Sequence, residues 1–162
     1  MLNYRQAKQR DKEGIKEVLV KSFEPTYAYY AQKSFTNLHN ALVAEDGGKV
    51  IGVINWRVFK VGEKKIGYLF WLAVQPELRR KGVAKSLIQN ATGDIRQEIG
   101  FGDIFAAVEK RNIPSGRLIE SLGFTLISRT AMKKRFGLRR FRLYFQMMLL
   151  PNEDLFIKAL TE

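Results

Sequence analysis

The sequence contains no cysteine, a single histidine and no long apolar run. Without cysteine there is no disulfide framework, no thiolate metal site and no cysteine nucleophile. The longest apolar stretch, at residues 144–150, is far shorter than the roughly 18–20 residues that span a bilayer. Residues 1–5 also lack the apolar core of a secretory signal peptide. We therefore expect a cytoplasmic protein that has no membrane partner and binds no metal.

Length and composition are those of a single globular domain. The chain has 162 residues, of which 46% are hydrophobic and 27% are charged, and this is enough to bury a sizeable core. No internal repeat, low-complexity tract or linker interrupts it. We expect one domain over residues 1–150, followed by a tail at residues 151–162 that forms at most a short helix.

The chain is strongly basic, with 28 lysines and arginines against 16 acidic residues and a net charge of +12. This balance favours an anionic partner, which can be a phosphorylated cofactor, a nucleic acid or an acidic protein. Residues 125–142 hold seven cations and no acid. This run is either the solvated tip of a hairpin or a surface that attracts an anionic substrate, and the sequence leaves both interpretations open.

Hydrophobic periodicity and turn residues predict an α+β protein with a mixed sheet. The strands at residues 66–74 and 104–108 are joined by a helix, and such a crossover makes them parallel neighbours. A closing hairpin is predicted at residues 124–150, with its turn at Gly137. The predicted strands are 4–7, 41–44, 50–58, 66–74, 104–108, 124–132 and 140–150, and the predicted helices begin at Asp11, Pro25, Val83 and Pro114.

The most informative segment joins the strand at residues 66–74 to the helix after it. Residues 72–84 read Leu-Ala-Val-Gln-Pro-Glu-Leu-Arg-Arg-Lys-Gly-Val-Ala. The basic, glycine-containing turn lies at a helix N-terminus, where backbone N–H groups lack intrahelical partners and the helix dipole favours anions. These features predict a phosphate site. The sequence has neither the Gly-Lys-Ser/Thr of a nucleotide P-loop nor a Gly-x-Gly-x-x-Gly after a strand.

The order of elements and two motifs resemble the GCN5-related N-acetyltransferase (GNAT) superfamily. The family's acyl-CoA signature, Arg/Gln-x-x-Gly-x-Gly/Ala, is present as Arg-Arg-Lys-Gly-Val-Ala at residues 79–84. Residues 112–124 resemble the second motif and retain its asparagine, leucine, glycine and phenylalanine. The resemblance covers residues 1–150. It implies a central sheet of about seven strands flanked by about four helices, and transfer of an acetyl group from acetyl-CoA to a primary amine of a small molecule or a protein.

The resemblance implies an acyl-CoA site built from both motifs. Turn amides would hold the pyrophosphate, and Gly82 would let the backbone approach it closely. The strand before the turn would pair with the pantetheine arm as an additional strand. Asn112 is either a further CoA contact or only the cap of the helix that begins at Pro114. The implied cofactor-binding residues are Leu72, Ala73, Val74, Arg79, Arg80, Lys81, Gly82, Val83, Ala84, Lys85 and Asn112.

The catalytic groups depart from the family pattern. The tyrosine that commonly protonates the leaving thiolate falls on Ile119, which cannot donate a proton. Tyr144 and Tyr68 are the candidates to replace it. Glu109 is the candidate general base, with a solvated position at a strand end as its alternative. For His39 we expect a surface or packing role.

Two other functions remain open. Ile119 also fits an acyl-CoA-binding regulatory module without efficient transfer. The charge of +12 also fits a basic nucleic-acid-associated protein, or an acetyltransferase whose target is acidic or bound to nucleic acid. Tyr27, Tyr29 and Tyr30 either line the acceptor site or form part of a helix face. Alternating apolar residues in the last predicted strand allow a monomer or a homodimer, and the sequence does not identify the acceptor.

Overall fold

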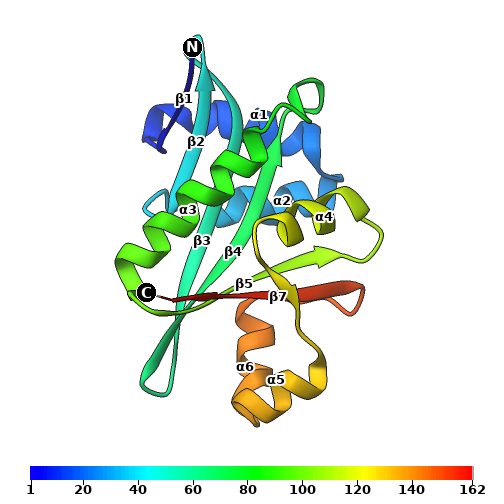
Figure 1. Ribbon diagram of the computed structural model, residues 1–162. Helices are drawn as coiled ribbons and strands as arrows, with labels where there is room; N and C mark the ends of the chain where they lie inside the picture. The colour runs from blue at the N-terminus through cyan, green and yellow to red at the C-terminus, as the bar shows by residue number, and fades with distance from the viewer. Residues whose placement is uncertain (162) are drawn as a thin grey trace. The chain divides into compact units, whose positions relative to one another are not determined.

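The helices and strands expected before residue 123 all form, and the sheet has the seven strands that the resemblance implies (Figure 1). The structure is a computed structural model and describes residues 1–161. Its strands are β1 (Leu2–Gln6), β2 (Ala41–Asp46), β3 (Lys49–Val61), β4 (Lys64–Val74), β5 (Gly102–Glu109), β6 (Thr125–Leu126) and β7 (Glu153–Leu160). Its helices are α1 (Lys12–Ser22), α2 (Pro25–Ser34), α3 (Val83–Ile99), α4 (Ile113–Ser121), α5 (Arg129–Phe136) and α6 (Arg139–Gln146), with short 3-10 helices η1 (Gln9–Asp11) and η2 (Pro76–Leu78).

The sheet is mixed, which confirms the predicted α+β class. Its strand order is β1-β2-β3-β4-β5-β7-β6. The β1–β2 and β2–β3 pairs are antiparallel, whereas β4 pairs in parallel with β5, as a crossover through α3 requires. Strand β7 runs antiparallel to both β5 and β6. Six α-helices form within residues 1–161, rather than about four.

The chain forms two compact units that share the long strands β3 and β4. The first unit comprises residues 1–56 and 71–94. Its core contains Ile15, Val18 and Leu19 of α1, which are buried together with apolar side chains of β2 and β3. These residues are spaced by three and four positions or lie next to one another, so they share one face of the helix, and burial of this face holds α1 on the strands.

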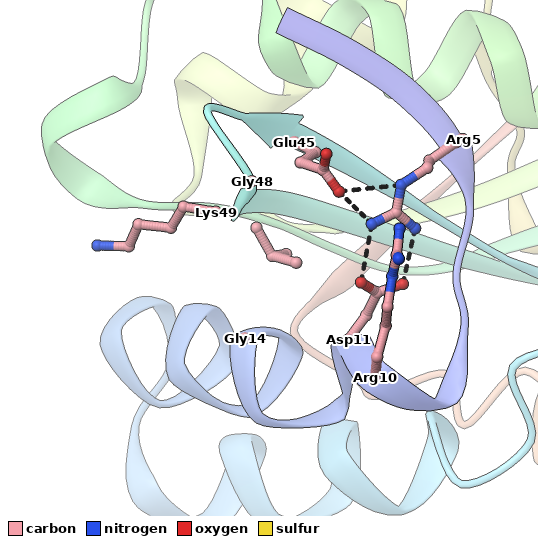
Figure 2. A pocket seen from close by; sticks show the side chains of 8 residues that line it. Arg5, Arg10, Asp11, Gly14, Glu45, Gly48 and Lys49 are labelled. Atoms are coloured by element: carbon pink, nitrogen blue, oxygen red, sulfur yellow. Dashed lines mark hydrogen bonds and ion pairs between the residues drawn. The ribbon is translucent and has the colours of Figure 1, made fainter.

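An ion-pair cluster supports the first unit (Figure 2). Arg5 of β1 makes a bidentate pair with Asp11, with Nη1–Oδ2 and Nη2–Oδ1 distances of 2.8 and 2.9 Å. Arg5 also donates to Glu45 of β2, and the three side chains form one wall of a pocket of about 580 Å³. The helix expected to begin at Asp11 starts one residue later, so Asp11 occupies the N-cap position of α1, but its side chain does not cap the helix. Its carboxylate instead accepts from Arg5 and from the Lys8 backbone N–H.

The second unit comprises residues 57–70 and the chain from Ile95 onward. Strands β4, β5 and β7 contribute one side of its core, and α5 and α6 contribute the other. In Figure 1 these two helices lie side by side below β7. The buried residues of this core are Ile66, Tyr68, Phe105, Met132, Leu143, Met147 and Leu155.

The prediction of a β-hairpin at residues 124–150 is wrong. Only Thr125–Leu126 forms a strand there, and α5 and α6 follow it. Ser128 caps α5, because its hydroxyl accepts from the Ala131 N–H at 3.0 Å. Gly137, with φ of 56°, ends α5. The predicted hairpin turn at this glycine is therefore the connection between two helices.

The apolar residues of α6 explain the wrong prediction. Residues 141, 143, 145, 147 and 149 are all apolar, which is the alternation of a strand. Leu143 and Met147 are also four residues apart, which places them on one face of a helix. Both are buried in the core of the second unit. Tertiary burial on this face therefore selects the helix over the strand.

The predicted C-terminal tail is also corrected. Instead of a short helix, Glu153–Leu160 forms strand β7. All eight residues pair with β5, from Glu153 opposite Glu109 to Leu160 opposite Gly102, and β6 pairs with the other edge of β7. The last residue of the predicted tail, 162, lies outside the described residues.

We expect Asp11→Asn to destabilise the protein by about 3 kcal/mol at pH 7, the scale for breaking a buried ion pair. The Arg5 guanidinium lowers the pKa of Asp11. The stabilisation is therefore present above the unfolded-state pKa and is lost as pH falls through the folded-state pKa. Urea unfolding at pH 7 and at pH 2–3 should show a large difference from wild type that shrinks in acid. Asp46→Asn, at an exposed carboxylate of β2 next to Glu45, is the matched control and should change stability by less than about 0.5 kcal/mol. An equal loss at both pH values for Asp11→Asn would contradict this explanation.

Candidate functional site

The chain leaves β4 through a segment that is firmly anchored in the first unit. The Val74 carbonyl accepts from Ser22 Oγ at 3.3 Å and from Arg79 Nε at 3.2 Å. Gln75 is almost fully buried. Its N–H donates to the Ile51 carbonyl at 2.9 Å, and its side-chain amide donates to the β3 backbone. These bonds fix the point from which the basic turn begins.

The turn itself is exposed and has an uncommon backbone conformation. The φ angle is 62° at Arg80 and 82° at Gly82. A side chain added at Gly82 would meet no protein atom within 4 Å. Glycine therefore satisfies a dihedral that other residues adopt at a cost, and it also leaves the space in front of the backbone open to a ligand.

The backbone N–H groups of residues 80–85 are free to bind that ligand. Among residues 1–161, none of these six groups donates to a protein oxygen, and the first bond of α3 runs from the Ser86 N–H to the Gly82 carbonyl at 3.0 Å. The amides of residues 83–85 lie at the positive end of the α3 dipole, and those of residues 80–82 belong to the turn directly before it. The arrangement fits a phosphate or diphosphate, which accepts several hydrogen bonds at once.

Four cationic residues lie within or next to this segment in the sequence, and all four are exposed: Arg79, Arg80, Lys81 and Lys85. Arg79 is partly committed, because its Nε donates to the Val74 carbonyl. That bond orients the guanidinium and leaves its terminal nitrogens available to an anion. Arg80, Lys81 and Lys85 make no ion pair within residues 1–161. The turn is therefore a strongly cationic place on the first unit.

Close packing holds the first turn of α3 in place. Val83, Leu87 and Ile88 are buried. Gly52 of β3 permits this contact, because a Cβ there would lie 3.1 Å from Val83 Cγ1 and 3.1 Å from Leu87 Cδ1. Both distances are tighter than ordinary side-chain contacts. The free amides therefore begin a helix that lies directly on the sheet.

A buried asparagine, which the sequence analysis did not single out, organises the strand before the turn. Asn55 of β3 is 2% exposed. Its Oδ1 accepts from the Trp71 N–H at 3.0 Å, and its Nδ2 donates to Ser34 Oγ at 2.8 Å. These bonds connect α2, β3 and β4. The signal in the sequence was one amide side chain within the apolar run of residues 50–56.

The aromatic residues of α2 have different environments. Tyr27 packs edge-on against Trp71 of β4, with ring centroids 6.4 Å apart, and Phe23 packs against the same indole at 5.4 Å. Tyr29 and Tyr30 contact each other and are exposed. Of the three tyrosines considered as acceptor-lining residues, Tyr27 is therefore the one held beside the strand that contains Leu72, Ala73 and Val74.

Asn112 lies in the second unit and caps α4. Its Oδ1 accepts from the Ser115 N–H at 3.2 Å. This geometry is the capping alternative raised from the sequence. The side-chain amide group of Asn112 donates to no protein atom within residues 1–161. It is the part of this residue that is available to a ligand.

Glu109 has a partner that the sequence analysis missed. It ends β5 opposite Glu153, the first residue of β7. Burial, followed by the charge of Glu109, raises the pKa of Glu153, although the Leu150 N–H at 2.8 Å and Arg129 act in the opposite direction. Glu153 was overlooked because its segment was assigned to a tail. Two carboxyl groups on neighbouring strands, one with a raised pKa, are suited to acid–base chemistry.

The two tyrosines proposed as acids have different settings. Tyr144 lies on α6 rather than on a strand, and its ring faces the Arg129 guanidinium at 4.8 Å. Its hydroxyl is buried and has no hydrogen-bond partner among the described residues. Burial strongly raises the pKa of Tyr68. Ile119 is buried in α4, as expected of a packing residue.

The first unit therefore contains the turn, the end of β4 and Asn55. The second unit contains Asn112, Glu109, Glu153 and Tyr144. His39 is exposed in the connection before β2. Within residues 1–161, no three histidine or acidic side chains are arranged to hold a metal ion.

Comparison with known proteins gives one consistent family. The model of the GNAT acetyltransferase family matches residues 9–124. A chain from the crystal structure of the NatC complex bound to Gag peptide and CoA is similar at a TM-score of 0.74 and 24% identity, over 99% of both chains. PaiA N-acetyltransferase from Thermoplasma acidophilum, in complex with coenzyme A, has a TM-score of 0.71 and 14% identity, over 99% of both chains.

A third solved structure, the ribosomal-protein-S18-alanine N-acetyltransferase from Escherichia coli, has a TM-score of 0.68 and 19% identity, over 99% of this chain and 93% of that one. No curated protein sequence matches significantly. At these identities the solved structures show a shared fold. The family model covers well over half of the sequence, including the turn and its helix. The chain therefore belongs to the GNAT family and is an acetyltransferase.

Proposed function

We propose that the protein is an acetyl-CoA-dependent N-acetyltransferase whose acceptor is a primary amine of a small molecule or of a protein. The observation that carries this proposal is the group of six unpartnered backbone amides at residues 80–85, at the start of α3 and beside an open glycine. Acetyl-CoA supplies an acetyl thioester, and transfer of its acyl group to an amine forms an amide and releases a thiol.

The turn would bind the cofactor through its backbone. The amides of Arg80, Lys81, Gly82, Val83, Ala84 and Lys85 are the donors for the pyrophosphate, and the side chains of Arg79 and Arg80 add charge. The backbone of Leu72, Ala73 and Val74 would carry the pantetheine arm. Asn55 positions this strand, because it holds the N–H of the preceding Trp71. Asn112 would contribute through its free amide group.

Acetylation requires an uncharged amine. An alkylamine with a pKa near 10.4 is almost wholly protonated at pH 7, and deprotonation costs about 4.6 kcal/mol. We assign this proton to the Glu109–Glu153 pair, because the two residues occupy opposing positions on β5 and β7. The raised pKa of Glu153 brings it closer to the operating pH than an ordinary glutamate. Tyr144 is the proposed acid, because the position at which the family commonly has the acidic tyrosine is Ile119 in this chain.

Acceptor chemistry is the least constrained part of the proposal. Similar structures include one bound to a Gag peptide and one named for acetylation of a ribosomal-protein alanine. These names support a peptide amine as the first acceptor class to test. Ile119 favours a second candidate function, an acyl-CoA-binding module that transfers the acetyl group poorly. Release of free CoA in the presence of peptide or small amines distinguishes the two.

We expect Gly82→Ala to weaken CoA binding at least tenfold, because the added methyl group occupies the space through which a pyrophosphate approaches the backbone. Isothermal titration calorimetry with CoA measures the change in affinity. Gly48→Ala is a matched control, because Gly48 also has φ of 82° and open space around its Cβ position. Both variants should lose about 1–2 kcal/mol of stability from backbone strain.

Only the Gly82 variant should lose affinity for CoA. If wild-type protein fails to bind CoA at millimolar concentration, the proposed function is wrong. If Gly82→Ala binds as wild type does, the turn is not the pyrophosphate site.

We expect Glu153→Gln to lower kcat/KM by about 10²–10⁴ and to remove the acidic limb of its pH profile, because the variant cannot take a proton. The assay measures CoA release with an amine found by screening. Asp154→Asn, at the next position of β7, is the control and should retain both activity and profile. An unchanged pH profile in Glu153→Gln would exclude Glu153 as the base.

Stability gives a second, independent test of Glu153. Since its folded-state pKa is raised, its contribution is most favourable below the unfolded-state pKa and is lost as pH rises through the folded-state pKa. Glu153→Gln should therefore gain Tm relative to wild type at pH 8 and show no gain at pH 4. A gain of the same size at both values would contradict the raised pKa.

A further inference from the structure

An apolar stripe on α6 is exposed to solvent and is not used by the fold. Leu138, Phe141 and Phe145 are spaced by three and four residues, so they share one helix face, and they are 81%, 55% and 85% exposed. Exposed Met148 follows just beyond the helix. The opposite face contains Leu143 and Met147, which already supply the buried contacts. The stripe therefore covers no part of the described core.

The stripe lies among positive charges with no acidic residue nearby in sequence. Residues 125–150 contain seven cations and no acid. Arg135 pairs with Asp103 at 2.6 Å. The others form no ion pair with any residue in the range 1–161. The unpaired and exposed cations of α5 and α6 are Arg129, Lys133, Lys134, Arg139 and Arg142.

Apolar contact and positive charge together restrict what can cover this surface. A second copy of the chain would bring like charges against each other and leave both sets unpaired. A nucleic acid would use the cations and could stack on Phe141 and Phe145, but it offers nothing to the aliphatic Leu138. An anionic bilayer uses both features, since its headgroups attract lysine and arginine and its acyl boundary accepts aliphatic and aromatic side chains alike.

We propose that α5 and α6 form a peripheral membrane-binding surface, with the stripe of Leu138, Phe141 and Phe145 inserted at the headgroup–acyl boundary of an anionic bilayer. No helix among residues 1–161 is long and apolar enough to cross a membrane. Helix α6 has eight residues, about 12 Å in length, and therefore lies along the interface. The sequence provided no reason to expect a membrane partner because it has no apolar run long enough to span a bilayer, and that criterion does not apply to a surface that binds at the interface.

The proposal is tested by sedimentation of the purified full chain with vesicles, without acetyl-CoA. Vesicles of phosphatidylcholine alone are compared with vesicles containing 30% phosphatidylglycerol at 0.1 M salt. We expect at least tenfold tighter binding to the anionic vesicles, with a further loss at 0.5 M salt because screening shortens the reach of surface charges. Equal binding to both vesicle types, or none to either, would overturn the proposal.

Variants distinguish binding through the stripe from nonspecific hydrophobic binding to vesicles. Phe141→Ser with Phe145→Ser should weaken binding to the anionic vesicles at least tenfold, while far-UV circular dichroism and Tm stay near wild type because both side chains are exposed. Phe101→Ser is the matched control, since Phe101 is 63% exposed outside α5 and α6, and it should bind as wild type does. Lys133→Gln with Lys134→Gln should reduce binding to anionic vesicles only.

Other occupants have their own signatures, each of which would overturn the proposal. Binding to poly(U) RNA that depends on Phe145, without vesicle binding, would make the surface a nucleic-acid site. A dimer in analytical ultracentrifugation that Phe145→Ser dissociates would make it an interface between copies. Vesicle binding that survives the double phenylalanine variant would place the contact elsewhere. Because acetyl transfer is not measured, failure here leaves the proposed enzyme function intact.

Discussion

The close approach of α3 to β3 is the contact on which the candidate cofactor site depends. Gly52 has no side chain, so Val83 and Leu87 can pack directly against this point of the strand. The first turn of α3 thus becomes part of the core, whereas the backbone groups just before it stay exposed. Helix N-termini always leave N–H groups without intrahelical partners. Here the packing fixes those of residues 83–85, the amides of residues 80–82 in the turn precede them directly, and the connection from β4 is short enough to keep all six near the end of that strand.

The turn that contains most of those amides is exposed to solvent, and solvent-exposed backbone groups cost a fold little. A phosphate group that binds there meets donors that are already ordered, so less conformational entropy of the protein is lost than on binding to a flexible loop. Asn55 extends the same principle to β4, since it commits one backbone N–H of the strand to a buried side chain. The first unit thus presents preorganised backbone rather than reactive side chains. The titratable groups considered for proton transfer belong instead to the second unit.

The first 122 residues could be read from sequence because local signals and tertiary packing agree there. Pro25 begins a helix, Gly47 and Gly48 form a tight turn, and the apolar face of α1 has helical spacing. The prediction was wrong after Phe124, because the apolar residues within 141–149 are compatible both with the alternation of a strand and with the spacing of a helix. Only burial of Leu143 and Met147 decides between helix and strand, and burial is not visible in a single sequence.

The candidate site shows the same division. The turn at residues 79–84 was found because its chemistry is local, and the capping role of Asn112 could be named as an alternative. Glu153 could not be found, since its significance comes from facing Glu109 across strands that are more than forty residues apart in sequence. The position of Asn55 between α2 and β4 is likewise a consequence of the fold.

The position of β7 in the sheet has a consequence for folding during synthesis. It lies between β5 and β6, yet it is synthesised after both of them. While the nascent chain still lacks residues 153–160, β5 exposes one whole edge and β6 has no partner strand. An open edge of this kind is a place where chains associate wrongly. The sheet can therefore be completed only after residues 153–160 have been synthesised, and the edge of β5 stays open to wrong pairing until then.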